Sequence, residues 1–178
     1  MLKTALVTDR HYLDHFPGRG HPERPERVKV LLDMAAGLHR ERLLRIAPRE
    51  ATVAELELCH DSRYVALVRQ SAARDSYDFD PDTHASRSTY HTSLLAAGGI
   101  LTAVEAVLQG ESDNGFAIVR PPGHHALPDH AMGFCFFNNV AIAATYLLRR
   151  YNFERVLILD IDAHHGNGTQ EIFYDTDK

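Results

Sequence analysis

The feature that most constrains the fold is a continuous apolar run, RVLILD at residues 155–160, which ends in a cluster of ionisable side chains. Such a run predicts a strand buried in a sheet. Asp160, Asp162 and His164 stand at alternate positions, and side chains at alternate positions share one face of an extended chain. Because desolvating these groups at a strand end is costly, we expect a cation to hold them there.

The donor types suit zinc. Zn²⁺ accepts imidazole nitrogen and carboxylate oxygen, and a catalytic ion keeps one position for water. We expect Asp162 and His164 as ligands, with Asp160 in a supporting position or on a second, harder cation. The glycines of HGNG at 165–168 allow the backbone to approach an ion closely. The alternative is a polar strand end at which His165 and Asp160 only cap neighbouring loops.

A second histidine pair follows another predicted strand, GFAIV at 115–119. Ligands of open parallel sheets bind at the carboxyl ends of strands, so His124 and His125 are expected to converge with the first cluster. Two prolines and a glycine at 121–123 restrict and bend the chain there, which suits a fixed general base. Taken alone, a tandem histidine on a surface would be the commoner interpretation.

Apolar patterns along the chain alternate between strand and helix, which predicts one α/β domain with a mainly parallel sheet flanked by helices. Strands are expected at 4–8, 115–119 and 155–160, and helices at 25–38, 61–73, 88–110 and 138–151. Gly98 and Gly99 indicate close packing of the third helix. The polar stretch 74–87 is expected to be one surface loop, either functional or merely solvated.

The composition of the chain indicates which kinds of partner it is expected to bind. The net charge is −5 without a basic stripe, so direct nucleic-acid binding is not expected. The N-terminal apolar run is too short for a signal peptide or a membrane span, and we expect a cytoplasmic protein without a membrane partner. Cys59 and Cys135 are expected to be buried thiols. The 12 histidines, many beside Gly, Pro, Asp or another His, favour metal or proton-transfer chemistry.

Four strings, HPERPERV, RPPGHHA, MGFCFFNNVAIAA and DIDAHHGNGTQ, together resemble the zinc-dependent deacetylase family of histone deacetylases, acetylpolyamine amidohydrolases and acetoin-utilisation proteins. They occur in the family's order across nearly the whole chain. Asn167 stands where many class I members carry Asp, so the chain looks closer to class II and bacterial class II-like members. The resemblance implies the N-terminal portion of the arginase–deacetylase fold.

The resemblance also implies residue roles. Asp162 and His164 match two zinc ligands, and Asp160, with backbone oxygens of both, matches a monovalent cation site, commonly K⁺. His125 matches the general acid/base, and His124 an electrostatic partner that Asp160 supports. The other matches are Gly133 and Phe134 in the wall of the acyl-lysine channel, His165, Asn167 and Cys135 as supporting residues, Arg27 as an internal-channel arginine, and Asp80 or Asp82 as a grip on the substrate backbone.

The implied function is zinc-dependent hydrolysis of the acetamide of an acetyl-lysine protein or an acetylpolyamine. The family's third zinc ligand and transition-state tyrosine come from later segments. Residues 1–178 are therefore expected to form a partial catalytic domain with little or no activity alone. Its exposed apolar sheet edge is expected to favour association, including with another copy of the chain.

Two other functions compete with this interpretation. A non-catalytic module could bind acetylated ligands or proteins on the same fold, although a binder needs no tandem histidine pair over a metal. An arginase-like binuclear hydrolase would need more metal-bridging aspartates, and RPPGHHA is foreign to it.

Overall fold

A computed structural model describes residues 2–38 and 40–177. The strands are β1 (Thr4–Thr8), β2 (Leu43–Ile46), β3 (Ser76–Asp80), β4 (Thr83–Ser86) and β5 (Asn114–Ile118). The helices are α1 (Pro25–Ala36), α2 (Val53–Leu56), α3 (Ser62–Ser71), α4 (Thr89–Leu108), α5 (Asn139–Arg150) and α6 (Asn167–Phe173), with the 3-10 turns η1 (Arg10–Leu13) and η2 (Arg40–Arg42).

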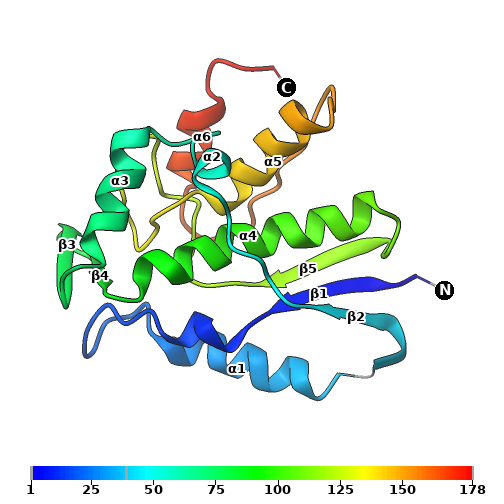
Figure 1. The fold of residues 1–178 in the computed structure, drawn as a ribbon, viewed down its shortest axis with the longest axis horizontal. Helices are drawn as coiled ribbons and strands as arrows, with labels where there is room; N and C mark the ends of the chain where they lie inside the picture. Colours follow the sequence, from blue (N-terminus) through cyan, green and yellow to red (C-terminus); the bar gives the residue numbers. More distant parts are fainter. Residues whose placement is uncertain (1, 39, 178) are drawn as a thin grey trace.

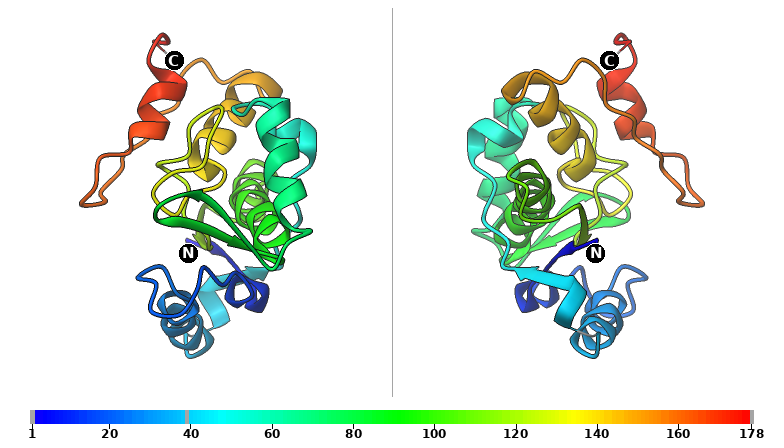
Figure 2. Two further views of the ribbon diagram at one scale, coloured as in Figure 1. Left: turned by 90° about the vertical axis from the view of Figure 1, so that its left-hand side faces the viewer. Right: turned by 90° about the vertical axis from the view of Figure 1, so that its right-hand side faces the viewer.

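The central sheet has three parallel strands in the order β2-β1-β5 (Figure 1). β1 is the middle strand, and its Ala5 pairs with Leu44 on one side and with Gly115 on the other. α1 covers one face of this sheet, while α4, with α5 beyond it, covers the other (Figure 2). The structure therefore has the expected α/β architecture, with a parallel sheet flanked by helices.

Helix α4 forms the centre of the molecule. A Cβ atom added at Gly98 would lie 1.9 Å from the Arg49 carbonyl oxygen, and one at Gly99 would lie 2.7 Å from the Tyr12 hydroxyl, so both glycines allow the close packing expected for them. Among the described residues, α4 alone is long and apolar enough to cross a membrane, but 67% of its apolar window is buried inside the protein. Burial of this extent is typical of a core helix.

The structure confirms the expected strands at 4–8 and 115–119, and the four expected helices are present with ends shifted by at most two residues. Both cysteines are free and buried, as expected.

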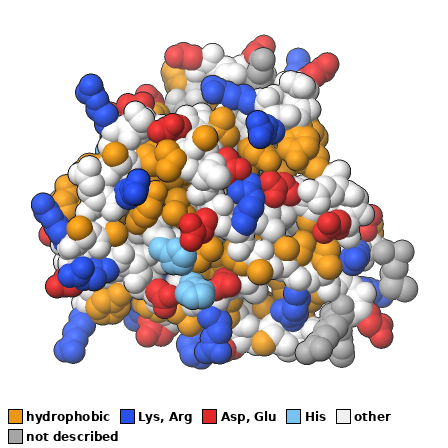
Figure 3. All heavy atoms as spheres, viewed as in Figure 1, with side chains coloured by type: hydrophobic (Ala, Val, Ile, Leu, Met, Phe, Trp, Pro, Cys, Tyr) orange, Lys and Arg blue, Asp and Glu red, His pale blue; other side chains and the backbone are white. Residues whose placement is uncertain are grey.

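The face in Figure 3 carries acidic and basic side chains intermixed, with apolar side chains exposed between them.

The strand expected at 155–160 is absent. This segment forms no ladder and runs beside the body of the protein towards α6 (Figure 2). Leu157, Leu159 and Ile161 are 89%, 80% and 90% exposed, whereas the alternate Val156 and Ile158 are half-buried. A doubly buried strand needs covering layers on both faces, and the described residues cover only one face of this segment.

The stretch 74–87 is not a single loop, because β3 and β4 form an antiparallel hairpin within it. Tyr77 and Phe79 alternate with polar residues and pack against the main hydrophobic core, and Ala85 of β4 is buried there. The polar residues between the aromatic ones hid this period-two pattern.

Candidate active site

The loop that carries His124 and His125 follows β5 and is fixed against the start of α5. The Asn139 side chain donates to the Pro121 carbonyl oxygen at 3.2 Å, and a Cβ atom at Gly123 would lie 2.6 Å from the Asn139 backbone nitrogen. Only glycine fits this contact. The loop therefore holds its histidines on a rigid backbone.

The second loop, at 160–168, is built from short turns closed by its own aspartates. The backbone N–H of Asp162 donates to Asp160 Oδ1 at 3.0 Å, and that of His164 donates to Asp162 Oδ1 at 2.8 Å. Such turns are a common use of aspartate, because its short side chain reaches a backbone N–H two residues on. Each carboxylate keeps its second oxygen for another partner.

The two loops meet at the start of α6. The backbone N–H of Thr169 donates to the His124 carbonyl oxygen at 3.1 Å. A Cβ atom at Gly168 would lie 2.2 Å from the Ala126 carbonyl oxygen, so this position also requires glycine. The α6 start thereby brings the two histidine pairs together.

Each ring of the tandem pair has its own partner across the junction. His124 Nδ1 lies 2.8 Å from Asp160 Oδ2, and His125 Nδ1 lies 2.6 Å from Asn167 Oδ1. Both partners are acceptors, so each neutral ring carries its proton on Nδ1 and keeps a lone pair on Nε2. The two ring centroids are 4.1 Å apart, and the His164 ring lies 6.2 Å from that of His125.

Asp162 and His164 lie side by side, with 3.0 Å between Oδ1 and Nδ1. They offer one carboxylate and one imidazole, which fit zinc by donor type. No group of three or more His, Cys, Asp or Glu side chains is arranged to hold a metal within 2–38 and 40–177. The pair is thus two ligands of a site that ordinarily has three from protein.

Hydrogen bonds keep both aspartates ionised. The backbone N–H of Asp162, followed by the His124 side chain, lowers the pKa of Asp160. The backbone N–H of His164, followed by its ring, lowers the pKa of Asp162. Ionised carboxylates are the form that binds a cation.

Residues 133–135 lie against the histidine loop. Gly133 has φ +56°, and a Cβ atom there would lie 2.5 Å from Cδ2 of His125. Phe134 donates its backbone N–H to Thr83 Oγ1 at 3.1 Å, and its ring packs edge-on against His21. Burial raises the pKa of the Cys135 thiol to about 12, which keeps it protonated and makes it a packing group.

The other expected residues make contacts outside the two histidine pairs. Arg27 is exposed on α1, whose buried face carries Val28, and its internal-channel role stays a prediction. His165 Nε2 bonds to Gln170 of α6. Asp80 accepts a hydrogen bond from the backbone N–H of Asp82 at the hairpin turn.

Sequence reasoning missed Glu23 and Arg120, which form a buried ion pair behind the histidine loop. Both lie in strings that the sequence analysis singled out, HPERPERV and RPPGHHA. The available signal was that each of these charged residues stands next to prolines in a string that was already singled out. Nothing in the sequence indicated that they pair across 97 positions.

The comparison with protein families decides the identity of the domain. The family described as "Histone deacetylase domain" matches residues 21–178. The chain belongs to the histone deacetylase family. Among the solved structures that it matches is the HD domain of HDA15, with a TM-score of 0.89 at 40% identity over 97% of this chain and 51% of that one.

Curated relatives of this histone deacetylase chain come from archaea, bacteria and animals. A probable deacetylase of Archaeoglobus fulgidus is 40% identical over 98% of this chain and 49% of its own length. A histone deacetylase-like amidohydrolase of Pseudomonas aeruginosa is 43% identical over 89% and 42%. The polyamine deacetylase HDAC10 of Homo sapiens is 44% identical over 86% and 24%. The chain thus spans about half, or less, of the relatives it matches.

Proposed function

We propose that this chain is the N-terminal part of a zinc-dependent deacetylase that hydrolyses the acetamide of acetyl-lysine or of an acetylated polyamine. The main support is one arrangement: two adjacent imidazoles with Nδ1 held by acceptors, beside the Asp162 and His164 pair. Relatives named as a deacetylase, an amidohydrolase and a polyamine deacetylase support the same reaction class.

Asp162 and His164 would hold the zinc ion. Bound there, zinc supplies Lewis acidity, which polarises an amide carbonyl and makes water easier to deprotonate. Asp160, with the backbone oxygens of Asp162 and His164, would hold a monovalent cation such as K⁺.

The tandem histidines supply the proton transfer. His125 keeps a free lone pair on Nε2 because Asn167 accepts its Nδ1 proton, so it takes a proton from water and returns it to the departing amine. His124 is held at Nδ1 by the Asp160 carboxylate, and we assign to it an electrostatic role beside His125 rather than proton exchange.

The channel beside His125 would select the substrate by shape. Gly133 lets its backbone lie directly against the ring of His125, and Phe134, whose ring packs edge-on against His21, would form an aromatic part of the channel wall. An apolar passage of this kind admits an extended aliphatic amine that carries a small acyl group.

We also propose that the 178-residue chain alone has little or no activity. Within its described residues only two candidate zinc ligands come together, whereas catalytic zinc ordinarily has three protein ligands. The function is therefore proposed for a protein of the length of its relatives, of which this chain spans about half or less.

The test is the substitution His125→Ala in the longer protein. Turnover of an acetyl-lysine peptide and of an N-acetylated polyamine should fall by a factor of about 10² to 10⁴, because the general base is lost, while zinc content stays unchanged. His130→Ala is the matched control, because the His130 side chain is exposed and pairs with the equally exposed Asp129. Unchanged turnover in His125→Ala would contradict the assigned role.

A further inference from the structure

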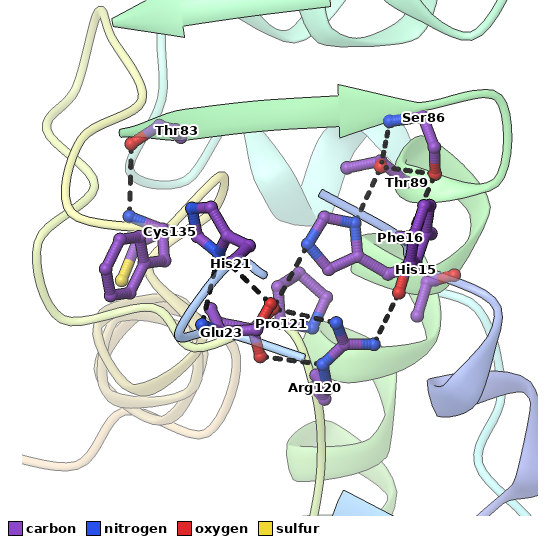
Figure 4. A network of polar contacts seen from close by, with 12 residues as sticks. His15, Phe16, His21, Glu23, Thr83, Ser86, Thr89, Arg120, Pro121 and Cys135 are labelled. Carbon is purple, nitrogen blue, oxygen red and sulfur yellow. Dashed lines mark hydrogen bonds and ion pairs between the residues drawn. The ribbon is translucent and has the colours of Figure 1, made fainter. Parts of the chain in front are cut away.

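A buried ion pair stands directly behind the histidine loop (Figure 4). Arg120 donates from Nε to Glu23 Oε1 at 2.6 Å and from Nη2 to Glu23 Oε2 at 2.8 Å. The relative exposures of Arg120 and Glu23 are 3% and 1%, so the pair is fully desolvated. The planar guanidinium and carboxylate thereby fix both distance and orientation, which a single hydrogen bond cannot do.

The Nη1 atom of Arg120 ties the side chain to η1 and to the segment that follows it. Nη1 donates to the carbonyl oxygens of Tyr12 at 2.9 Å and His15 at 2.7 Å. These acceptors come from a segment more than 100 positions away in the sequence. One side chain therefore joins the end of β5 to two other parts of the chain.

His15 contacts the Glu23 carboxylate as a second partner beside Arg120. Its Nε2 lies 3.3 Å from Glu23 Oε2 and its Nδ1 lies 2.7 Å from Thr89 Oγ1, at the start of α4. Burial lowers the pKa of His15, so the ring is neutral. Burial alone would raise the pKa of Glu23, but hydrogen bonds from His15 and Arg120 outweigh it and keep the carboxylate ionised. The cluster is thus electrically balanced, with one positive and one negative charge.

Arg120 is also close in sequence to the candidate site. Only Pro121, Pro122 and Gly123 separate it from His124, and both prolines have a fixed φ. The Asn139 side chain donates to the carbonyl oxygen of Pro121, the first residue of this path, and so holds it in place. A displacement at Arg120 is therefore passed to the two imidazoles rather than absorbed by a flexible linker.

We propose that Glu23 and Arg120 are positioning residues that set where the loop at 121–126 leaves β5, and hence where His124 and His125 lie. A buried ion pair contributes little net stability compared with apolar packing, but it is strongly directional. The catalytic consequence rests on the proposed function, whereas the structural consequence can be measured without it.

The test compares Glu23→Gln with Glu55→Gln in the 178-residue chain by amide hydrogen exchange. Glutamine keeps the shape of Glu23 and removes its charge. Glu55 is a matched control, because it also forms a two-pronged pair with an arginine, Arg49, at 2.8 and 2.9 Å, away from the histidine loop. Arg120→Lys is the second variant, which keeps the charge but loses the fork.

Two amides report on the loop directly. The N–H of Ala126 donates to the Gly123 carbonyl oxygen and that of Thr169 donates to the His124 carbonyl oxygen, each at 3.1 Å. We expect both to exchange about tenfold faster or more in Glu23→Gln and Arg120→Lys, and to be unchanged in Glu55→Gln relative to the Thr92 amide of α4. Equal acceleration of all amides, or unchanged loop amides in a folded variant, would overturn the proposal.

Kinetics in the longer protein separate positioning from chemistry. Glu23→Gln should lower kcat by about 10- to 100-fold because the imidazoles are displaced, and KM should change little because Phe134 keeps its backbone hydrogen bond to Thr83. If both loop amides loosen and kcat is unchanged, the catalytic consequence is wrong. If the unsubstituted longer protein hydrolyses no acetamide, the proposed function fails, and the exchange result still decides the positioning role.

Discussion

The two imidazoles of the tandem pair differ in what holds them. His124 faces a carboxylate, that of Asp160, and His125 faces the neutral amide of Asn167. The carboxylate places a negative charge beside the His124 ring, whereas the amide oxygen orients the His125 ring without adding a charge. This difference supports a stabilising role for His124 and proton exchange at His125.

His60 is a buried histidine whose two nitrogens are both satisfied in the neutral form. Its Nδ1 donates to the Leu127 carbonyl oxygen and its Nε2 accepts from the Asn138 backbone N–H, each at 2.9 Å. Burial lowers the pKa of His60 to about 4 from its ordinary 6.5. The ring thus joins the loop before α3 to the start of α5, behind the histidine loop.

The stability of the chain should therefore depend on pH through His60. The unfolded state binds the proton more readily, so the free energy of unfolding is highest above pH 6.5 and falls as the pH is lowered towards 4, by about 3 kcal/mol in total. Urea unfolding between pH 7 and pH 4.5 measures this dependence. His60→Gln should reduce the slope, and equal slopes in the two proteins would contradict the assignment.

At the scale of elements, the sequence predicted a helix or strand correctly where the segment's own apolar pattern was enough to specify it. The residues of α4 bury themselves on several sides, and the Asn138 side chain caps α5 through the Ala141 N–H, as its sequence indicates. The segment at 155–160 has an equally clear pattern and still forms no strand. A strand needs a neighbour and two covering layers, which are properties of the surroundings rather than of the run itself.

The candidate site was likewise predictable in part. His124 and His125 were expected near Asp160 and His164 from the rule that parallel strands direct their carboxyl ends to one edge of a sheet. The two loops do meet, but at the start of α6 and not through a strand at 155–160, which is absent. The Arg120 contacts to Tyr12 in η1 and to His15 after it could not be derived in this way, because they depend on side-chain geometry between distant parts of the chain.

At the scale of the whole molecule, one row of exposed apolar side chains stands out, formed by Leu157, Leu159 and Ile161. Such a row on an extended segment favours association. We expect the 178-residue chain to self-associate as its concentration rises in sedimentation velocity, and a triple serine variant of these residues to remain monomeric. Val30→Ser, on an exposed apolar residue of α1, is the control and should change nothing. A wild-type chain that stays monomeric throughout would contradict the expectation.

The central claim is that Asp162 and His164 form part of a zinc site that the described chain does not complete. Titration of the 178-residue chain with zinc against a competing chelator tests it most directly. We predict weak binding, in about the micromolar range or weaker, that is lost in Asp162→Asn and in His164→Ala, because two ligands hold zinc poorly. Tight binding of one zinc per chain, or binding that survives both substitutions, would contradict the account.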